Sequence, residues 1–279
     1  MIYARLHGRL GNQMFQYAAA RALAERCGVG VALDTRGVLA RGEGVLTRVF
    51  SLDLAKPERL PPMRNAAPFR YALWRYLGGQ PKFQRERGLA FNPAFHTWGD
   101  DTYLHGYWQT DQYFADIANR IRSDFTFPDF STPQNAEMAA RIESSNAIAL
   151  HVRRGDYLAL GAHPLCDQAY YDAALEAIMQ DVSPPATVFV FSDDPEWARD
   201  HLSVPMEKVV VDFNGPELDF EDMRLMSLCR HNVIANSSFS WWSAWLNTQA
   251  GQRVAAPAKW FGDPKLSNPD ILPSNWLQI

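Results

Sequence analysis

The sequence predicts an α/β protein made of two Rossmann-like lobes that face a central cleft. In the second half of the chain, short apolar runs alternate with helical patterns, which is typical of a parallel sheet covered by helices. The first half opens with a strand, a glycine-containing turn, a long helix and a second strand, which together form a β-loop-α-β unit. A Pro-containing stretch at 128–133 suggests a linker, so we expect lobes at residues 1–132 and 133–279.

The second lobe has the clearer succession of elements. Its expected strands are 147–152, 187–191, 209–211, 233–235 and 253–256, and its expected helices are 168–180, 196–201, 218–229 and 241–249. In the first lobe we expect strands at 2–6 and 29–33 and helices at 12–27 and 113–123. Residues 36–98 give no clear pattern, because Pro and Gly are frequent and apolar periodicity is weak.

The composition of the chain limits which partners the protein is expected to bind and where in the cell it is expected to lie. The 279 residues include 27 Lys and Arg against 31 Asp and Glu, and this net charge of −4 argues against nucleic acid as a partner. No signal peptide is recognisable, and the uncharged stretch 232–252 contains too many Asn, Ser and Gln residues for a spanning helix. Three widely spaced cysteines indicate free thiols. We expect a cytoplasmic protein, with peripheral contact at the inner face of the membrane left open.

A basic motif follows the first strand of the second lobe. Two guanidinium groups, Arg153 and Arg154, lie between His151 and Gly155-Asp156, at the carboxyl end of a buried strand. Ligands of open α/β sheets bind outside such strand ends, and the planar fork of arginine matches phosphate oxygens. Neighbouring residues of a strand point in opposite directions, so one arginine can reach a ligand while a carboxylate such as Asp156 holds the other. A solvated surface pair is the alternative.

Three further loops follow apolar runs and precede helices. Gly8-Arg9-Leu10-Gly11-Asn12-Gln13 is neither a dinucleotide fingerprint nor a P-loop, but its glycines and the helix start favour an anion. The other two loops are 191–194 and 236–242, which offer carboxylates, hydroxyls and backbone N–H groups. For each loop the alternative is a tight turn or helix capping. Four such loops together predict a site for an anionic, hydroxylated ligand.

Motifs for metal and nucleophilic chemistry do not occur in the sequence. There is no His-Glu-x-x-His pattern, no Asp-x-Asp and no Gly-x-Ser-x-Gly. We therefore expect no metal and no cofactor, with arginines and helix ends supplying the positive charge at the anion.

Five segments resemble one enzyme family. Segments 8–18, 151–157 and 236–246 closely resemble the bacterial α-1,2-fucosyltransferases of glycosyltransferase family 11, and segments 106–109 and 226–235 fit the same pattern. The resemblance implies a GT-B fold and an inverting, metal-independent transfer of L-fucose. The donor would be GDP-β-L-fucose and the acceptor the 2-hydroxyl of a terminal β-galactoside glycan, as in lipopolysaccharide O-antigen synthesis.

The resemblance also implies roles for residues. Arg153 would hold the diphosphate, Asn12 would approach the fucosyl phosphate, and His151 and Asp193 would lie near the guanosine. The donor-binding residues expected in this way are Gly11, Asn12, His151, Arg153, Arg154, Asp193, Asn236, Ser237, Ser238, Phe239 and Ser240. The expected catalytic residues are Arg153, Asp156 and Asn12, while His7 and Arg9 would affect the acceptor side.

Some alternatives stay open at this stage. Asp156 and Asp111 are candidates for the general base, but the sequence does not identify the base. A fucosyltransferase of another linkage, a transferase of another nucleotide sugar and a non-catalytic sugar-binding module remain rival functions. The natural acceptor and the oligomeric state cannot be read from the sequence.

Overall fold

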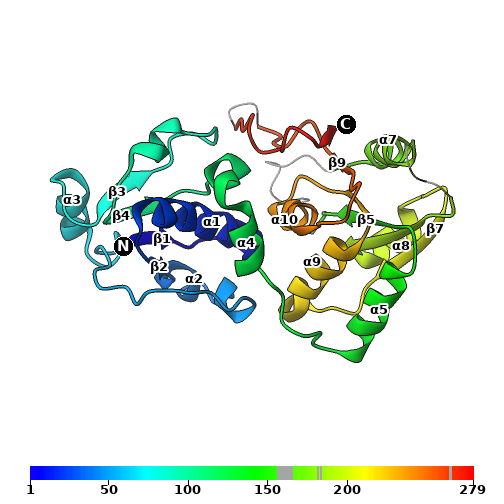
Figure 1. Ribbon diagram of the computed structural model, residues 1–279, viewed down its shortest axis with the longest axis horizontal. Helices are drawn as coiled ribbons and strands as arrows, with labels where there is room; N and C mark the ends of the chain where they lie inside the picture. The colour runs from blue at the N-terminus through cyan, green and yellow to red at the C-terminus, as the bar shows by residue number, and fades with distance from the viewer. Residues whose placement is uncertain (156–165, 181, 183, 264–265) are drawn as a thin grey trace. The chain divides into compact units, whose positions relative to one another are not determined.

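The computed structural model describes residues 1–155, 166–180, 182, 184–263 and 266–279. The chain divides into two compact units, each built around its own parallel sheet (Figure 1). Unit 1 comprises Met1–Phe127 and Asn268–Ile271, and unit 2 comprises Pro128–Ser267 and Leu272–Ile279. Unit 1 thus ends at Phe127, slightly before the expected boundary at residue 132. The short segment Asn268–Ile271, near the C-terminus, also belongs to unit 1. The α/β class with parallel sheets is confirmed.

Unit 1 is a four-stranded sheet with helices and short turns around it. Its strand order is β2-β1-β4-β3, and all neighbours are parallel. The strands are β1 (Ile2–Arg5), β2 (Val31–Asp34), β3 (Lys82–Arg85) and β4 (Thr102–His105), and the helices are α1 (Leu10–Cys27), α2 (Arg36–Leu39), α3 (Pro68–Tyr76) and α4 (Ala118–Asp124). Short 3₁₀ turns occur at Leu46–Arg48, Pro93–Thr97, Asp111–Tyr113 and Ala115–Ile117.

Helix α1 is buried along most of its length, and most of its buried residues are apolar, with Gln13, Gln16 and Arg21 as the buried polar exceptions. It ends at Gly28, whose φ of +66° is the left-handed conformation that commonly closes a helix. The expected strand-turn-helix-strand unit is therefore confirmed, with boundaries shifted by one or two residues.

Two parts of unit 1 differ from the expectation. The helix expected at 113–123 consists of two 3₁₀ turns followed by the short α4. The stretch without a clear pattern, 36–98, contains α2, α3 and β3. Strand β3 lies at the edge of the sheet and is largely exposed, so it carries no buried apolar run that periodicity could reveal.

Unit 2 is a six-stranded parallel sheet in the order β10-β9-β8-β5-β6-β7. Its strands are β5 (Ala147–Val152), β6 (Thr187–Ser192), β7 (Glu207–Val211), β8 (His231–Val233), β9 (Val254–Ala256) and β10 (Leu277–Gln278). Its helices are α5 (Pro133–Glu143), α7 (Gln168–Met179), α8 (Pro195–His201), α9 (Asp219–Leu228) and α10 (Ser238–Leu246), with a 3₁₀ turn at Pro216–Leu218. The expected strands and helices are present, with boundaries shifted by up to three residues: the strand expected at 233–235 is β8, and the helix expected at 241–249 is α10. Helix α5 and strand β10 were not expected.

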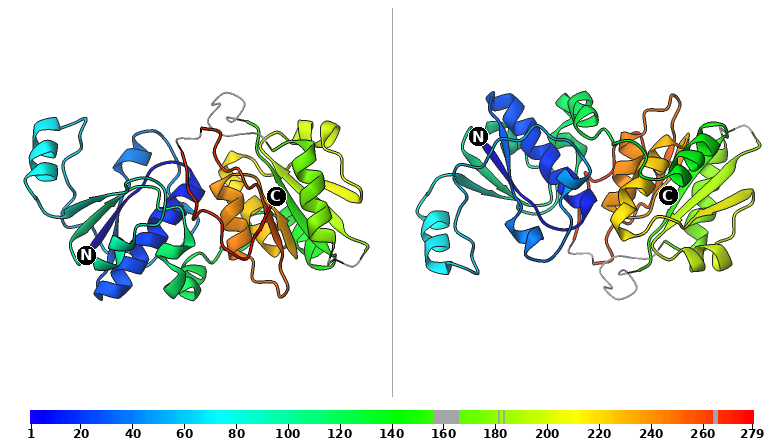
Figure 2. Two further views of the ribbon diagram at one scale, coloured as in Figure 1. Left: turned by 90° about the horizontal axis from the view of Figure 1, so that it is seen from above. Right: turned by 90° about the horizontal axis from the view of Figure 1, so that it is seen from below.

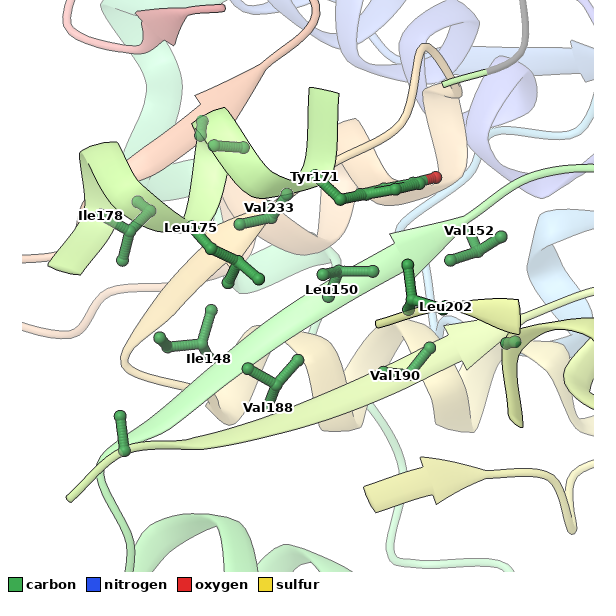
Figure 3. Packing of buried hydrophobic residues seen from close by; sticks show 14 of the residues in the cluster. Ile148, Leu150, Val152, Tyr171, Leu175, Ile178, Val188, Val190, Leu202 and Val233 are labelled. Atoms are coloured by element: carbon green, nitrogen blue, oxygen red, sulfur yellow. The ribbon is translucent and has the colours of Figure 1, made fainter. Parts of the chain in front are cut away.

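Side chains of β5 alternate between two apolar cores. Ile148, Leu150 and Val152 lie in the core that includes Tyr171, Leu175 and Ile178 of α7, as Figure 3 shows. Ala147 and Ala149 face the opposite core, which includes residues of α5 and α9. Helices thus cover both faces of the sheet, which accounts for the complete burial of β5 (Figure 2).

The order of the strands reverses direction next to β5. From β5 the chain adds β6 and then β7 on one side, and it later adds β8, β9 and β10 on the other. The boundary between β5 and β8 is therefore the topological switch point of this sheet. In open α/β sheets, ligands generally bind outside the carboxyl ends of the strands at this point. In the part of the chain that the structure describes, no helix is long and apolar enough to cross a bilayer.

Candidate functional site

The candidate site of unit 2 lies at the carboxyl ends of the strands beside the switch point. The loop after β5 carries Arg153 to Gly155, the loop after β6 carries Asp193 and Asp194, and the loop after β8 leads into the start of α10. Because β8, β5 and β6 are consecutive neighbours in the sheet, the structure places these three sequence-predicted loops at one edge.

Arg153 is held by the carboxylate of Asp193. The distance between Arg153 Nη1 and Asp193 Oδ2 is 3.1 Å, and both side chains are only slightly exposed, at 15% and 23%. Asp193 also accepts the backbone N–H of Arg154 through its other oxygen, at 2.9 Å. One carboxylate thus fixes both the guanidinium and the backbone of this loop. The sequence interpretation assigned Asp193 to the guanosine, whereas here its two oxygens contact the arginine loop.

Arg154 is directed to different partners. Its Nε lies 3.3 Å from Asp194 Oδ2, and its guanidinium carbon lies 3.9 Å from the centre of the Trp197 ring. Asp194 also caps α8 by accepting the N–H of Trp197. The carboxylate that holds the second arginine is therefore Asp194, while the expected partner, Asp156, lies outside the described residues. Arg154 therefore stabilises the loop through an ion pair with Asp194 and a cation–π contact with Trp197, whereas Arg153 pairs with Asp193.

Gly155 is required by the close approach of Asp193. A Cβ atom at position 155 would lie 2.6 Å from Asp193 Oδ2, which is shorter than real contacts of a Cβ atom allow. The glycine of the motif therefore allows the carboxylate to reach between the two arginines.

His151 is the second-last residue of β5 and is buried. Burial lowers its pKa to about 3, and the nearby positive charge of Arg153 acts in the same direction. Among the described residues, its buried Nδ1 has no hydrogen-bond partner, and its ring lies 5.7 Å from that of Phe239. A neutral, unpaired ring nitrogen beside Arg153 can still accept or donate a hydrogen bond.

The loop before α10 is mostly engaged in its own structure. Ser237 caps the helix by accepting the N–H of Phe239 at 3.3 Å. Ser240 is fully buried and donates to the carbonyls of Ala235 and Ser237. Asn236 is also buried, and its amide donates to the carbonyl of Trp260. Ser240 has no exposed atom for the expected phosphate contact, because its hydroxyl stabilises the helix start; Ser238 lies partly exposed at the first helical position.

In unit 1, the glycine loop holds Asn12 at the start of α1. Gly8 has a φ of +75°, and a Cβ atom there would lie 2.5 Å from Asn12 Nδ2. Gln109 donates from Nε2 to Asn12 Oδ1 at 2.8 Å. Gly11 is buried in the first turn of the helix, and Arg9 is exposed at its N-cap without a side-chain cap. The helix start thus lacks a capping carboxylate, which leaves its positive end suited to an anion.

Three polar residues that the sequence interpretation missed, two of them buried glutamines of α1, stabilise the glycine loop and the segment 107–108. Gln13 donates to the carbonyls of Gly8 and Gly44 at 2.8 Å each, and it accepts the N–H of Leu46. Glu86 accepts the N–H groups of Tyr107 and Trp108. The third, Gln16, binds His7 and is considered next. A polar residue in an otherwise apolar helix was the available signal, because an unpaired buried amide would be costly.

Gln16 fixes the tautomer of His7. Its Oε1 accepts the N–H of His7 at 3.0 Å, so its Nε2 must be the atom that faces both the carbonyl of His7 and the ring Nδ1, at 3.0 and 3.2 Å. Nδ1 is therefore an acceptor, and the proton of the neutral ring lies on Nε2. Burial lowers the pKa of His7 to about 4. His7 thus offers a neutral N–H donor, packed edge-on against Tyr107 with 4.5 Å between ring centres.

Asp156 and Asp111 are the two candidates for the general base. Asp156 lies outside the described residues. Asp111 belongs to unit 1, and burial raises the pKa of its carboxyl above the ordinary value, against hydrogen bonds from backbone N–H groups. A raised pKa improves a carboxylate as a proton acceptor. Among the described residues, no group of three or more His, Cys, Asp and Glu side chains could hold a metal ion.

With this geometry established, comparison with known proteins decides the family. The model of glycosyl transferase family 11 matches residues 80–279, which is more than half of the chain. The chain belongs to glycosyl transferase family 11. The match covers the whole of the arginine loop and the start of α10, and it leaves the glycine loop of this glycosyltransferase outside.

Curated relatives of this family 11 enzyme include two that are named for α-1,2 transfer of a sugar and one that is named for O-antigen biosynthesis. An α-1,2-colitosyltransferase of Escherichia coli is 31% identical over all of this chain and 99% of its own length. The O-antigen biosynthesis glycosyltransferase WbnK of the same species is 38% identical over 49% of this chain and 46% of its own. Galactoside α-(1,2)-fucosyltransferase 1 of Lagothrix lagotricha is 26% identical over 86% of this chain and 63% of its own.

Solved structures of fucosyltransferases share the fold. The α-1,6-fucosyltransferase NodZ soaked with GDP-fucose has a TM-score of 0.52 at 15% identity, over 88% of this chain and 91% of its own. An Arabidopsis thaliana FUT1 variant in complex with GDP has a TM-score of 0.50 at 14% identity, over 91% of this chain and 69% of its own. The family 11 enzyme therefore has the GT-B type of fold that the resemblance implied.

Proposed function

We propose that this family 11 enzyme transfers L-fucose from GDP-β-L-fucose to the 2-hydroxyl of a terminal β-galactoside, and that it serves lipopolysaccharide O-antigen synthesis. The product would be an α-1,2-fucoside, formed with inversion and without a metal ion. Relatives named for α-1,2 transfer and for O-antigen synthesis support the linkage and the role. The observation that carries the donor part is the position of Arg153 beside the switch point of unit 2.

Arg153 suits the charge that develops during this reaction. As the bond to the sugar breaks, the leaving GDP gains negative charge and the ring becomes oxocarbenium-like. A guanidinium already oriented by Asp193 can stabilise the diphosphate without reorganising at the moment of reaction. The partner carboxylate keeps the cation in place when no donor is bound, and a diphosphate brings the oxygens that replace part of that contact.

In this proposal the remaining predicted residues support either the donor or the acceptor. His151, Arg154 and Ser238 remain our candidates for donor contacts in unit 2, with Asp193 as the residue that orients the arginines. In unit 1, Asn12 remains the candidate for the fucosyl phosphate. His7 is assigned to the acceptor as a hydrogen-bond donor and not as the base, since its Nδ1 is already bound to Gln16.

The proton of the acceptor hydroxyl needs a base, for which Asp156 and Asp111 both remain candidates. The raised pKa of Asp111 favours a role in proton transfer. Activities of Asp111→Asn and Asp156→Asn, with GDP binding measured in parallel, separate the two. The variant that keeps GDP binding and loses transfer identifies the base, and two variants with full activity would exclude both.

One incubation tests the proposed function. The enzyme is mixed with GDP-fucose and lactose in the presence of EDTA, and the product linkage is determined by NMR. Fucose on the 2-position of galactose is the expected result. Because a colitosyltransferase is among the relatives, a parallel incubation uses a GDP-colitosyl donor. Faster transfer from that donor would show that the enzyme transfers colitose and not fucose. Lactose binding without any GDP release would instead indicate a sugar-binding module.

A further inference from the structure

Helix α3 of unit 1 exposes an apolar stripe on the side away from the sheet. Its inner residues, Tyr71 and Trp74, are buried, and the ring of Trp74 packs edge-on against Tyr103 at 5.5 Å. Phe69, Leu73 and Tyr76 lie four and then three positions apart, so they share the opposite face of the helix. The helix is therefore apolar on two sides, although the sheet covers one of them.

The exposure of this stripe is high for side chains of this size. Phe69 is 75% exposed, Tyr76 is 72% exposed, and Leu77, which directly follows the helix, is 77% exposed. Together with Leu73 these account for four of the seven large hydrophobic side chains that are exposed in the described residues. An exposed apolar group of this kind marks an interaction surface, whereas single exposed residues need no explanation.

The chain around this helix is strongly basic. Residues 56–88 contain eight Lys and Arg but only two Asp and Glu, so their net charge is +6 in a chain whose total is −4. The basic residues are Lys56, Arg59, Arg64, Arg70, Arg75, Lys82, Arg85 and Arg87. In the described part of the chain none of them forms an ion pair with a carboxylate, unlike Arg26, Arg36 and Arg41. Their charge is available to an external anion.

A hollow of about 580 Å³ lies beside the end of α3 and brings three of these cations together. Arg75, Arg85 and Arg87 line it, along with the ring of Tyr76. The one acidic residue of the hollow, Glu86, is directed to the backbone N–H groups of Tyr107 and Trp108. It therefore does not form an ion pair with the arginines. The hollow suits a phosphate group close to an apolar surface.

We infer that α3 and the basic residues around it bind the surface of a bilayer that contains anionic phospholipid. An amphipathic helix with aromatic and aliphatic side chains inserts between head groups, and flanking Lys and Arg side chains contact lipid phosphates. A protein partner would need its own complementary acidic surface, whereas an anionic bilayer supplies both apolar and negative groups to one face. The inference does not depend on the sugar that the enzyme transfers. Glycan synthesis on a membrane-bound acceptor would benefit from it.

Co-sedimentation with vesicles tests this inference. The full chain is mixed with vesicles of phosphatidylcholine alone or of phosphatidylcholine with phosphatidylglycerol, at 0.1 and 0.5 M salt, two conditions that differ widely in screening. We expect binding to the anionic vesicles at low salt and release at high salt. A wild-type chain that stays in the supernatant with anionic vesicles would overturn the inference.

Two pairs of variants locate the surface. Phe69→Ser with Tyr76→Ser removes the apolar stripe, and its control is Leu39→Ser with Leu266→Ser, two exposed residues outside α3. Arg85→Gln with Arg87→Gln lowers the charge by two, and its control is Arg141→Gln with Arg199→Gln in unit 2. We expect about a fivefold loss of vesicle binding for each cation removed from the surface. Equal binding by test and control variants would contradict the location.

Two readouts keep the result independent of folding and of the proposed function. Circular dichroism tests whether the variants fold. If the serine pair does not fold, vesicle binding by the Arg85→Gln, Arg87→Gln pair alone tests the location of the surface. Turnover with free lactose should be unchanged, since α3 is not part of the site. If light scattering finds a wild-type dimer that the serine pair dissociates, α3 binds a second copy and the inference is wrong.

Discussion

The carboxylate of Asp193 contacts Arg153 Nη1 at 3.1 Å and the backbone N–H of Arg154 at 2.9 Å, so one side chain orients the whole arginine loop. This contact explains why two adjacent arginines, alike in sequence, have different surroundings. Arg154 is committed to Asp194 and Trp197, while Arg153 shares its carboxylate with the loop backbone.

We expect Arg153→Ala to lower kcat by about 10²–10³-fold or more, the usual cost of removing one preorganised donor from a developing negative charge. Arg141→Ala is the matched control, because Arg141 forms an exposed ion pair with Glu207, the first residue of β7, whereas the arginine loop follows the last residue of the parallel strand β5. Steady-state transfer rates and thermal melts measure the effect. Retention of more than about a tenth of wild-type turnover in a folded Arg153→Ala protein would contradict the role.

Gly155→Ala should lower turnover by about 10–100-fold, since a misplacement near 1 Å at the reacting centre costs about that much. The new Cβ atom would lie 2.6 Å from Asp193 Oδ2 and would displace the carboxylate that orients Arg153. Gly215→Ala is the control, because no atom lies within 4 Å of a Cβ there and its φ of −77° suits any residue. Similar kinetics for the two alanine variants would show that the contact is unimportant.

Gly8→Ala should impair both stability and transfer. The φ of +75° imposes backbone strain of about 1–3 kcal/mol on alanine, and the Cβ atom would also lie 2.5 Å from Asn12 Nδ2. Gly28→Ala carries similar strain at a φ of +66°, with no atom near its Cβ. Urea unfolding should therefore show a loss in both variants, whereas transfer should fall only in Gly8→Ala. Full activity in folded Gly8→Ala would argue against a role for Asn12.

Stability should fall as the pH decreases from about 6.5 towards 4. Burial lowers the pKa of His151 and His105 to about 3 and that of His7 to about 4, so the unfolded chain binds protons before the folded one does. The free energy of unfolding then rises with pH between the folded and unfolded pKa values, by at most about 1.4 kcal/mol per pH unit for each histidine. Below the folded values this contribution no longer changes.

Urea unfolding of wild type at pH 7.5, 6.0 and 5.0 measures that dependence. His105→Asn should reduce its slope, because one buried neutral ring is removed. A slope that is the same in His105→Asn and in wild type would contradict the assignment.

Much of unit 2 could be predicted because its inner strands, β5, β6, β8 and β9, are buried on both faces. The run 147–152 is apolar on both faces of its strand apart from His151 and is buried throughout. Helices α7, α8 and α10 begin with side-chain caps, at Asp167, Asp194 and Ser237, whereas α9 has none. The edge strand β3 and helix α3 could not be predicted, since one is exposed and the other is apolar on two sides. The apolar pattern of β3 and α3 identifies them as strand and helix only when the residues that pack against them are known.

The sequence by itself determined the α/β class, the strand-end loops, the family and the motif that contains Arg153. It could do so because those features depend on local runs of residues and on short motifs. Only the tertiary structure decided which carboxylate holds each arginine, that Ser240 is buried, that Gln16 sets the tautomer of His7 and that α3 exposes its apolar face. Each of these depends on residues brought together by the sheet or by the packing of a helix, and no local pattern records such distances.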